Sequence, residues 1–315
     1  MPSFLEFEKP IAELQGRIDE LRETAADGAV DIDAEIGRLQ AKSDKLLRDT
    51  FAKLSPWQKT QVARHPERPH FKNYVAGLFE EFLPLAGDRA FGDDQAILGG
   101  FAAFRGRRIM VIGHEKGSDT ASRIRHNFGM GKPEGYRKAI RLVELADRFA
   151  LPIVTLVDTS GAFPGIQAEE RGQAEAIARS TEACLNAGVP VVAAIVGEGG
   201  SGGAVALAAG NRVLMFEHAV YSVISPEGCA SILWRTADRA ADAAEAMRVT
   251  AQDLKSLGII DTIVAEPLGG AHRAPSTAIA ALGDTIERSL KDLAPLSAQE
   301  LKADRRAKFL KMGRL

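Results

Sequence analysis

The chain has 315 residues, of which 45% are hydrophobic and 26% are charged. This apolar content is enough for a sizeable core and exceeds that of disordered chains. The formal net charge is only -2, because 40 basic and 42 acidic side chains nearly cancel, so no broad attraction to nucleic acid is expected. Composition therefore indicates a soluble globular protein, and it leaves open whether the chain forms more than one domain or one large α/β domain with appended helices.

The two cysteines, Cys184 and Cys229, lie among apolar or small residues and form no C-x-x-C pair. We expect two buried, reduced thiols and no metal site. The N-terminal stretch MPSFLEFEKP is acidic where an export signal would be basic and then apolar. No apolar stretch approaches the roughly 20 residues that span a bilayer. These features predict a cytoplasmic protein that does not enter a membrane.

The first part of the chain carries the spacing of amphipathic helices. Apolar residues recur every three or four positions over residues 11–21 and again over 32–47, where Ser43 interrupts the second series. A turn at residues 25–29, with Asp31 capping the second helix, would join the two into a hairpin. The hairpin could pack on its own domain or against another subunit, and the sequence leaves both open.

Two more helices are expected before residue 90. Ser55, Pro56 and Gln58 have the arrangement of a capping box with a first-turn proline, and His65-Pro66 ends that helix. A second amphipathic pattern predicts a helix over residues 71–82, followed by a turn at 85–88.

From residue 96 the pattern changes to short extended runs. The runs at 96–104 and 107–114 predict a β-hairpin. Downstream, uninterrupted apolar strands alternate with helices, which is typical of a largely parallel sheet covered by helices. Strands are expected over residues 152–158, 190–196, 212–216 and 259–264, and helices over 135–149, 169–186, 203–209, 275–293 and 297–312. The resulting division is an N-terminal helical region (1–90), an α/β core (91–265) and C-terminal helices (266–315).

The segment GEGGSGGA, residues 197–204, falls between a buried strand and a short Ala-rich helix. Each glycine costs backbone entropy on folding. A run of glycines is therefore expected where the backbone must approach a neighbour closely or adopt positive φ angles. Because they run into a helix start, the amides of Gly202, Gly203 and Ala204 are free donors at the positive end of a helix dipole. Such amides can stabilise an oxyanion.

A second loop, DTSGAFPGIQAEERGQ at residues 158–173, follows the preceding strand. Loops at the carboxyl ends of adjacent parallel strands share one crevice, so we expect the two loops to meet and form the site. The alternative is that the glycines and proline of this loop only turn the chain tightly. The residues predicted to bind substrate are Gly161, Ala162, Phe163, Pro164, Gly165, Gly199, Gly200, Ser201 and Ala204.

The glycine run has other possible interpretations. It lacks the G-K-[S/T] of a phosphate-binding loop and the spacing of a dinucleotide fingerprint. Gly199–Gly203 does match the G-x-S-x-G of a nucleophile elbow, which would make Ser201 a hydrolase nucleophile. Against this, Gly197 and Glu198 are expected to separate the strand from the motif, and His218 and His272 are the only candidate bases. A non-catalytic scaffold is a third possibility.

Other charged residues have structural and functional interpretations. Glu198 either orients the loop or a substrate, or it is a solvated loop carboxylate. His114 and His126 are interpreted as structural. A local group of basic residues either forms a solvated helix face, which we favour, or meets the phosphates of coenzyme A or an acidic carrier protein. These basic residues are Arg123, Arg125, Lys132, Arg137, Lys138 and Arg141.

Seven segments occur in order along the chain: RHPERP (64–69), IGHEKG (112–117), RHNFGM (125–130), the two glycine-containing loops, YSVISPEGCASILW (221–234) and EPLGGAHR (266–273). Together they resemble the bacterial acetyl-CoA carboxylase carboxyltransferase α subunit family, over nearly the whole chain. Ser160 and Phe163 depart from the family pattern, which has proline and tyrosine there. Both changes keep the turn and the bulk.

The resemblance implies a crotonase-like fold, a spiral of β-β-α units in which paired amides form oxyanion holes. It implies an α2β2 heterotetramer with a β subunit that carries a zinc ribbon, and the transfer of a carboxyl group from carboxybiotin to acetyl-CoA, giving malonyl-CoA for fatty acid biosynthesis. Carboxybiotin would arrive on a biotin carboxyl carrier protein, and ATP would be used by a biotin carboxylase partner. No cofactor would be bound covalently to this chain.

The resemblance also gives the predicted site a mechanism. Loss of the carboxyl group places negative charge on the ureido oxygen of biotin. We assign its stabilisation to the amides of Gly202 and Gly203, with Ala204 as a contender. The freed biotin nitrogen, or a group near it, would then take a proton from the acetyl methyl, so no side-chain base is required.

Overall fold

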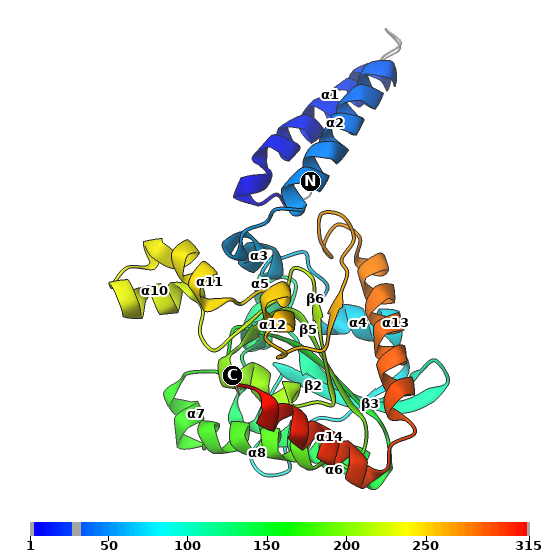
Figure 1. The fold of residues 1–315 in the computed structure, drawn as a ribbon, viewed down its shortest axis with the longest axis vertical. Helices are drawn as coiled ribbons and strands as arrows, with labels where there is room; N and C mark the ends of the chain where they lie inside the picture. The colour runs from blue at the N-terminus through cyan, green and yellow to red at the C-terminus, as the bar shows by residue number, and fades with distance from the viewer. Residues whose placement is uncertain (1–2, 27–32, 314–315) are drawn as a thin grey trace.

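The computed structural model describes residues 3–26 and 33–313. In this part of the chain one mixed sheet has the strand order β1-β2-β3-β4-β5-β6-β8, and β7 pairs with the end of β5 (Figure 1). The strands are β1 (Glu80–Pro84), β2 (Ile97–Phe104), β3 (Arg107–His114), β4 (Ile153–Thr159), β5 (Val191–Gly200), β6 (Arg212–Phe216), β7 (Val220–Ser222) and β8 (Thr262–Val264).

Helices cover this sheet, and those labelled α6, α8 and α14 lie together below it in Figure 1. The helices are α1 (Lys9–Ala26), α2 (Asp33–Phe51), α3 (Pro56–Ala63), α4 (Phe71–Leu78), α5 (Thr120–Arg125), α6 (Pro133–Arg148), α7 (Ile166–Glu170), α8 (Gln173–Asn186), α9 (Ser201–Ala208), α10 (Pro226–Trp234), α11 (Ala240–Met247), α12 (Ala251–Ser256), α13 (Pro275–Leu293) and α14 (Ala298–Lys311).

The sheet is largely parallel and begins with an antiparallel hairpin, as predicted. β2 and β3 form the expected antiparallel hairpin, and β3, β4, β5, β6 and β8 run parallel. β4 and β5 are buried along their whole length, as uninterrupted apolar runs require when helices cover both faces. The two glycine-containing loops begin at the carboxyl ends of these strands, so the buried sheet holds the start of each loop in a fixed position.

Several predicted elements have different bounds. The helix expected over 169–186 is divided into α7 and α8, and the strand expected over 259–264 begins at Thr262. The helix expected over residues 71–82 ends at Leu78, and β1 follows, because this segment pairs antiparallel with β2 and becomes the first strand of the sheet. β5 extends to Gly200 rather than ending at residue 196, because its last residues pair with β7. The division of the chain at residues 90 and 265 stays a prediction.

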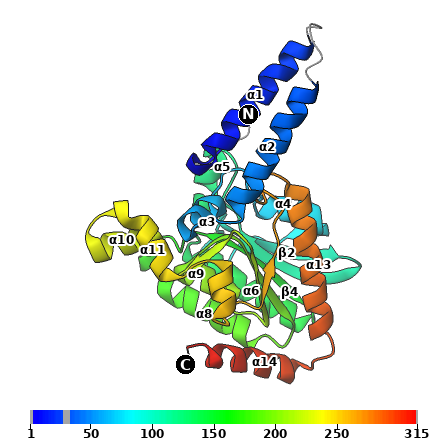
Figure 2. The same ribbon diagram turned by 45° about the horizontal axis from the view of Figure 1, so that its top comes forward.

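The N-terminal hairpin is present as α1 and α2, which extend away from the body of the protein (Figure 2). Ile11, Leu14 and Ile18 are buried on α1. Ser43, the polar residue in the second apolar series, is also buried. Most of the predicted turn and its cap Asp31 lie outside the described residues.

Several short elements between residues 118 and 256 did not stand out in the sequence. They are α5, β7, α10, α11 and α12, each nine residues or shorter, so each offers too few turns for a clear period.

Cys229 lies on α10 and is only half-buried, so the expectation of two buried thiols is correct for Cys184 alone.

A buried ion pair fastens the segment after α3 to the sheet. Arg68 donates to both carboxylate oxygens of Glu266, at 2.8 and 2.9 Å, and to the carbonyl of Val196 in β5. The amides of His218 and Ala271 also donate to Glu266. Burial by itself would raise the pKa of Glu266, but Arg68 and these donors outweigh it and lower the pKa to about 2.

A second buried arginine fastens the last helix. Arg305 on α14 is fully buried and donates to the side-chain oxygen of Asn211. It also donates to the carbonyls of Leu185, Ala187 and Val189, at the end of α8 and just before β5. These carbonyls are left without helical or strand partners, so the guanidinium satisfies them and holds α14 against the core.

We expect Glu266→Gln to lower the free energy of unfolding at pH 7 by about 3 kcal/mol, because it leaves buried Arg68 without a counter-charge. The folded-state pKa is depressed, so the stabilisation is present above the ordinary pKa of 4.5 and is lost as the pH falls toward 2. Urea denaturation at pH 7 and pH 3 measures both effects. An equal difference between variant and wild type at the two pH values would contradict this account.

Arg305→Ala should lower the free energy of unfolding by about 3 kcal/mol, because it leaves several buried carbonyls without a donor. Arg306, the next residue on α14, is exposed and provides the matched control. Its substitution by alanine should change stability by less than about 0.5 kcal/mol. Urea denaturation followed by circular dichroism compares the two variants, and similar values for both would show that the Arg305 network is unimportant.

Candidate functional site

The two glycine-containing loops meet at the carboxyl ends of β4 and β5, as predicted. A Cβ added to Gly200 would lie 2.2 Å from the carbonyl oxygen of Ser160, and one added to Gly203 would lie 2.7 Å from the carbonyl carbon of Gly161. Neither position has room for any side chain. Close backbone approach therefore requires glycine at these two positions. In the other loop, Gly161 has a φ of 149° and an added Cβ there would meet nothing within 4 Å, which fits the alternative that this glycine turns the chain.

A bulge in β5 shapes the end of this strand. The pairing of β4 with β5 is regular up to Val157 and then shifts, so that Thr159 lies opposite Gly199. The buried Asp158 carboxylate fills the gap, where it accepts from the amide of Glu198 at 2.9 Å. A Cβ on Gly197 would lie 2.4 Å from the same carboxylate oxygen. Asp158 thus sets the path of β5 into the glycine run.

The first turn of α9 presents the predicted amides. The helix begins at Ser201, its N-cap is Gly200, and no side chain caps it. The amides of Gly202 and Gly203 therefore lack intrahelical acceptors and lie at the positive end of the helix dipole. Ala204 is buried one position further along the helix. This arrangement can hold an oxygen on which negative charge develops.

The second loop forms the opposite side of the same junction. The amide of Phe163 donates to the carbonyl of Gly131 at 3.0 Å, and Gln173 donates back to the carbonyl of Phe163. The Phe163 ring packs over Gly165, where a Cβ would be 2.3 Å from the ring. The remaining predicted loop residues, Ala162 and Pro164, are half-buried and exposed. Phe163 is thus held through both its amide and its carbonyl.

Ser201 has part of the geometry of a nucleophile elbow. β5 runs up to Gly200 and Ser201 adopts a φ of 51°, so the expectation that Gly197 and Glu198 interrupt the strand was wrong. However, the Ser201 hydroxyl forms no hydrogen bond with any described residue. The candidate bases have other partners: His272 stacks on His65 at 3.9 Å, and His218 packs against a phenylalanine of α2. The geometry does not support a serine hydrolase.

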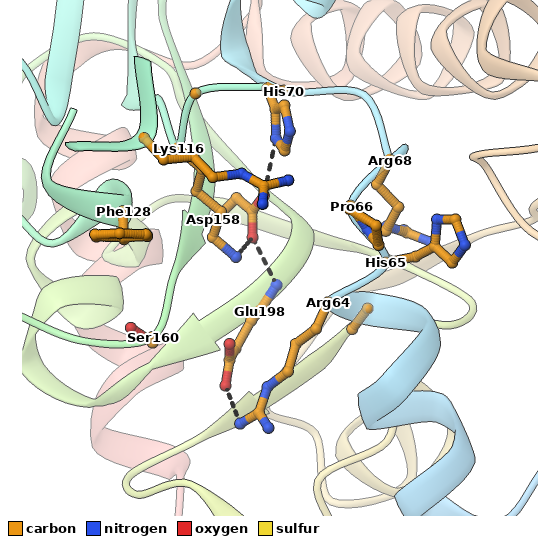
Figure 3. A pocket seen from close by; sticks show the side chains of 13 residues that line it. Arg64, His65, Pro66, Arg68, His70, Lys116, Phe128, Asp158, Ser160 and Glu198 are labelled. Atoms are coloured by element: carbon orange, nitrogen blue, oxygen red, sulfur yellow. Dashed lines mark hydrogen bonds and ion pairs between the residues drawn. The ribbon is translucent and has the colours of Figure 1, made fainter. Parts of the chain in front are cut away.

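A cavity of about 240 Å³ lies beside the junction, with Ser160 and Glu198 in its wall (Figure 3). It collects residues from segments that are far apart in the sequence, including the RHPERP, IGHEKG and RHNFGM motifs. The lining consists of Ala63, Arg64, His65, Pro66, Arg68, His70, Lys116, Gly117, Arg123, Phe128, Asp158, Ser160 and Glu198.

Ion pairs dominate one side of the cavity. Lys116 lies 2.6 Å from Asp158, while Arg64 bridges Glu198 and Glu227 at 2.6 Å each. Burial would raise the pKa of Asp158, but Lys116 and the amide of Glu198 lower it. Glu198 is itself buried, so its interpretation as a solvated loop carboxylate was wrong. It joins the glycine run to the segment after α3.

His70 completes the buried part of the cavity wall. Burial lowers its pKa and outweighs the attraction of Asp158, whose carboxylate lies 4.0 Å from Nδ1. Neither ring nitrogen has a hydrogen-bond partner among the described residues. Sequence analysis assigned no role to Arg64, His70, Lys116 or Asp158. The only sequence signal was the density of charged residues and prolines in the motifs that contain them.

Half of the predicted basic cluster serves the fold. Lys138 is buried and donates to Asp93, Arg137 donates to Asp88, and Arg141 donates to the carbonyl of Ala86. These side chains of α6 hold the loop between β1 and β2. The expectation of a solvated helix face is therefore wrong for Lys138, whereas Arg137 and Arg141 are half-buried.

The predicted structural histidines are buried. His126 Nδ1 hydrogen-bonds to the carbonyl of Gln95 at 2.6 Å, and burial lowers the pKa of His114 to about 4. Within residues 3–26 and 33–313, no group of three or more His, Cys, Asp or Glu side chains could hold a metal ion. Among the same residues, no helix combines the length and apolar character needed to cross a bilayer.

Solved structures with the same fold are carboxyltransferases and decarboxylases. The chain superimposes on transcarboxylase 12S with a TM-score of 0.59 at 20% identity, over 72% of this chain and 42% of that one. It superimposes on a subunit of a Pseudomonas malonate decarboxylase hetero-dimer with a TM-score of 0.54 at 16% identity, over 67% of this chain and 83% of that one. These matches confirm the predicted crotonase-like fold.

Sequence comparison is more specific. Residues 4–313 match the family described as acetyl co-enzyme A carboxylase carboxyltransferase-like. The acetyl-coenzyme A carboxylase carboxyl transferase subunit alpha of Rhizorhabdus wittichii is 74% identical over 99% of this chain and 100% of the relative. The protein of the same name from Sphingopyxis alaskensis is 72% identical over the full length of both. The chain therefore belongs to the acetyl-CoA carboxylase carboxyltransferase family.

Proposed function

We propose that this chain is the α half of a carboxyltransferase that moves the carboxyl group of N-carboxybiotin to acetyl-CoA, giving malonyl-CoA. The observation that supports this most directly is the uncapped first turn of α9, where Gly203 packs against Gly161 in the loop after β4. The full-length likeness to relatives named as alpha subunits supplies the reaction class.

The reaction requires stabilisation of a negatively charged oxygen. It does not require a side-chain nucleophile. When the bond between the ring nitrogen and the carboxyl carbon breaks, negative charge moves onto the ureido oxygen. The Gly202 and Gly203 amides would donate to that oxygen, and removing one such donor in other enzymes costs about 3 kcal/mol of transition-state stabilisation. The ring nitrogen takes the proton that the acetyl methyl loses, so the carbanion can attack the released carboxyl carbon.

This chain supplies one of the two oxyanion sites that the reaction needs. The thioester carbonyl of acetyl-CoA also gains negative charge, and we assign its stabilisation to a β subunit that would carry a zinc ribbon. A carrier protein would deliver carboxybiotin, and a biotin carboxylase would use the ATP. A complex that uses acetyl-CoA and ATP in this way would work in the cytoplasm.

An exposed apolar surface suits the companion subunit. α10 and α11 extend from the body of the protein (Figure 1), and the side chains of Ile232 and Leu233 on α10 are 72% and 63% exposed. Val223, just before α10, is 80% exposed. Large exposed apolar side chains that lie together are typical of protein interfaces. The segment that contains Val223, α10 and α11 begins directly after β7, and β7 pairs with the glycine run. A subunit bound to this segment would therefore lie close to the site.

Gly203→Val should lower carboxyltransferase activity about a hundredfold or more, because even a Cβ at this position would lie 2.7 Å from Gly161 and displace the amides. Activity is measured in reverse, by following acetyl-CoA formation from malonyl-CoA and free biocytin with the assembled α and β chains. Gly16→Ala on α1, where an added Cβ meets nothing within 4 Å, is the matched control. Each subunit alone should be inactive.

Ser201→Ala separates this function from the hydrolase alternative. The assembled variant should keep most of its carboxyltransferase activity, because the proposed donors are backbone amides that alanine retains. A chain that cleaves the thioester without its partner, and loses this activity with Ser201→Ala, would contradict the proposed function. So would an assembled wild-type pair that forms no acetyl-CoA.

A further inference from the structure

Phe128 lines the cavity but has no role in the mechanism described so far. Its side chain is 52% exposed, and Figure 3 shows the ring on the same side of the cavity as Lys116 and Ser160. The ring packs into none of the hydrophobic clusters formed by the described residues. It also has no aromatic partner among them. The ring therefore contributes little to the stability of this chain.

The backbone that presents this ring is strained. Asn127, Phe128 and Gly129 have φ angles of 48°, 53° and 79°, three successive residues in the left-handed region. Glycine adopts this conformation readily and asparagine tolerates it, but a bulky side chain such as phenylalanine is disfavoured there. Strain of this kind persists where the surrounding structure imposes it, and it is concentrated at functional sites.

The surrounding contacts do impose this turn. The amide of Met130 donates to the carbonyl of Asn127 at 2.9 Å, and the Asn127 side chain donates back to the carbonyl of Met130 at 2.7 Å. A Cβ on Gly129 would lie 2.8 Å from the Lys116 side chain and 3.0 Å from the carbonyl oxygen of Asp158. The turn is thus seated on the end of β4, beside the ion pair in the cavity.

The cavity chemistry limits what the ring can contact. Arg64, Arg68 and Lys116 are each paired with a carboxylate at 2.6 to 2.8 Å, so they offer little to the phosphates of coenzyme A. Arg123 is the one cation of the lining without a carboxylate partner among the described residues. An exposed aromatic face next to paired charges and one unpaired cation suits a small ring that carries a single carboxylate.

We propose that Phe128 packs against the carboxyl-carrying ring of carboxybiotin and determines how tightly that substrate is held. This inference rests on the proposed function, and it adds a specificity-determining side chain to a site that was otherwise described by backbone amides. Because the turn is already strained into place without ligand, the aromatic face is preorganised and binding need not order it.

The test is steady-state kinetics of the assembled α and β chains in the reverse reaction, with biocytin and malonyl-CoA varied in turn. Phe128→Ala should raise the KM for biocytin about tenfold, the effect of losing one aromatic contact, and leave the KM for malonyl-CoA within about twofold. Phe128→Tyr keeps the aromatic face and should restore the wild-type value. Phe149→Ala removes a ring of similar exposure, 58%, that does not line the cavity, and should change neither constant.

A purely structural role gives different results. Phe128→Gly removes the ring and also relieves the positive φ, so it should bind biocytin as weakly as Phe128→Ala while melting at the same or a higher temperature than wild type. A fall in melting temperature of more than about 2 °C would show that the ring stabilises the fold. Weaker association with the β chain, measured by sedimentation velocity, would show that Phe128 is an interface residue.

The two proposals fail in separate ways. If the wild-type pair is active but Phe128→Ala leaves the KM for biocytin unchanged, or raises the KM for malonyl-CoA equally, the role of Phe128 is overturned and the carboxyltransferase function stands. If the wild-type pair is inactive, the proposed function itself fails.

Discussion

The structure depends on the close approach of two loops between which no side chain fits. Gly200 and Gly203 lie so near to Ser160 and Gly161 that even a methyl group at either glycine would overlap the opposite backbone. Because the two strands that carry these loops are buried and parallel, their carboxyl ends cannot move apart to make room. The uncapped amides at the start of α9 follow from this constraint, since the glycine run has no side chain that could cap them.

Buried charge keeps the glycine run in place from the other side. Asp158 fills the bulge of β5, while Arg68 reaches the carbonyl of Val196 in the same strand and Arg64 holds Glu198. Each of these buried charges has an oppositely charged partner, so the low dielectric of the interior strengthens the attraction between them. The segment after α3 is therefore part of the site, although strands β1 to β4 lie between it and the glycine run along the chain.

The local geometry around Ser201 shows why a motif alone does not establish a function. A strand that ends directly before a serine with positive φ is what a hydrolase uses to expose its nucleophile. Here no described histidine hydrogen-bonds to the hydroxyl, and the neighbouring amides lie uncapped at the start of α9. The same strand, turn and helix can serve either chemistry, and the surrounding side chains decide between them.

The sequence by itself determined the alternation of strands and helices, the N-terminal hairpin, the capping box at Ser55 and the meeting of the two glycine-containing loops. These features depend on local period, on turn chemistry and on the rule that adjacent parallel strands end at one edge. Only the tertiary structure decided that residues 80–84 form a strand and that Lys138 is buried. It also brought Arg64, Lys116 and Phe128 into one cavity. Pairing energies and ion pairs arise between segments that are distant along the chain, so no local pattern records them.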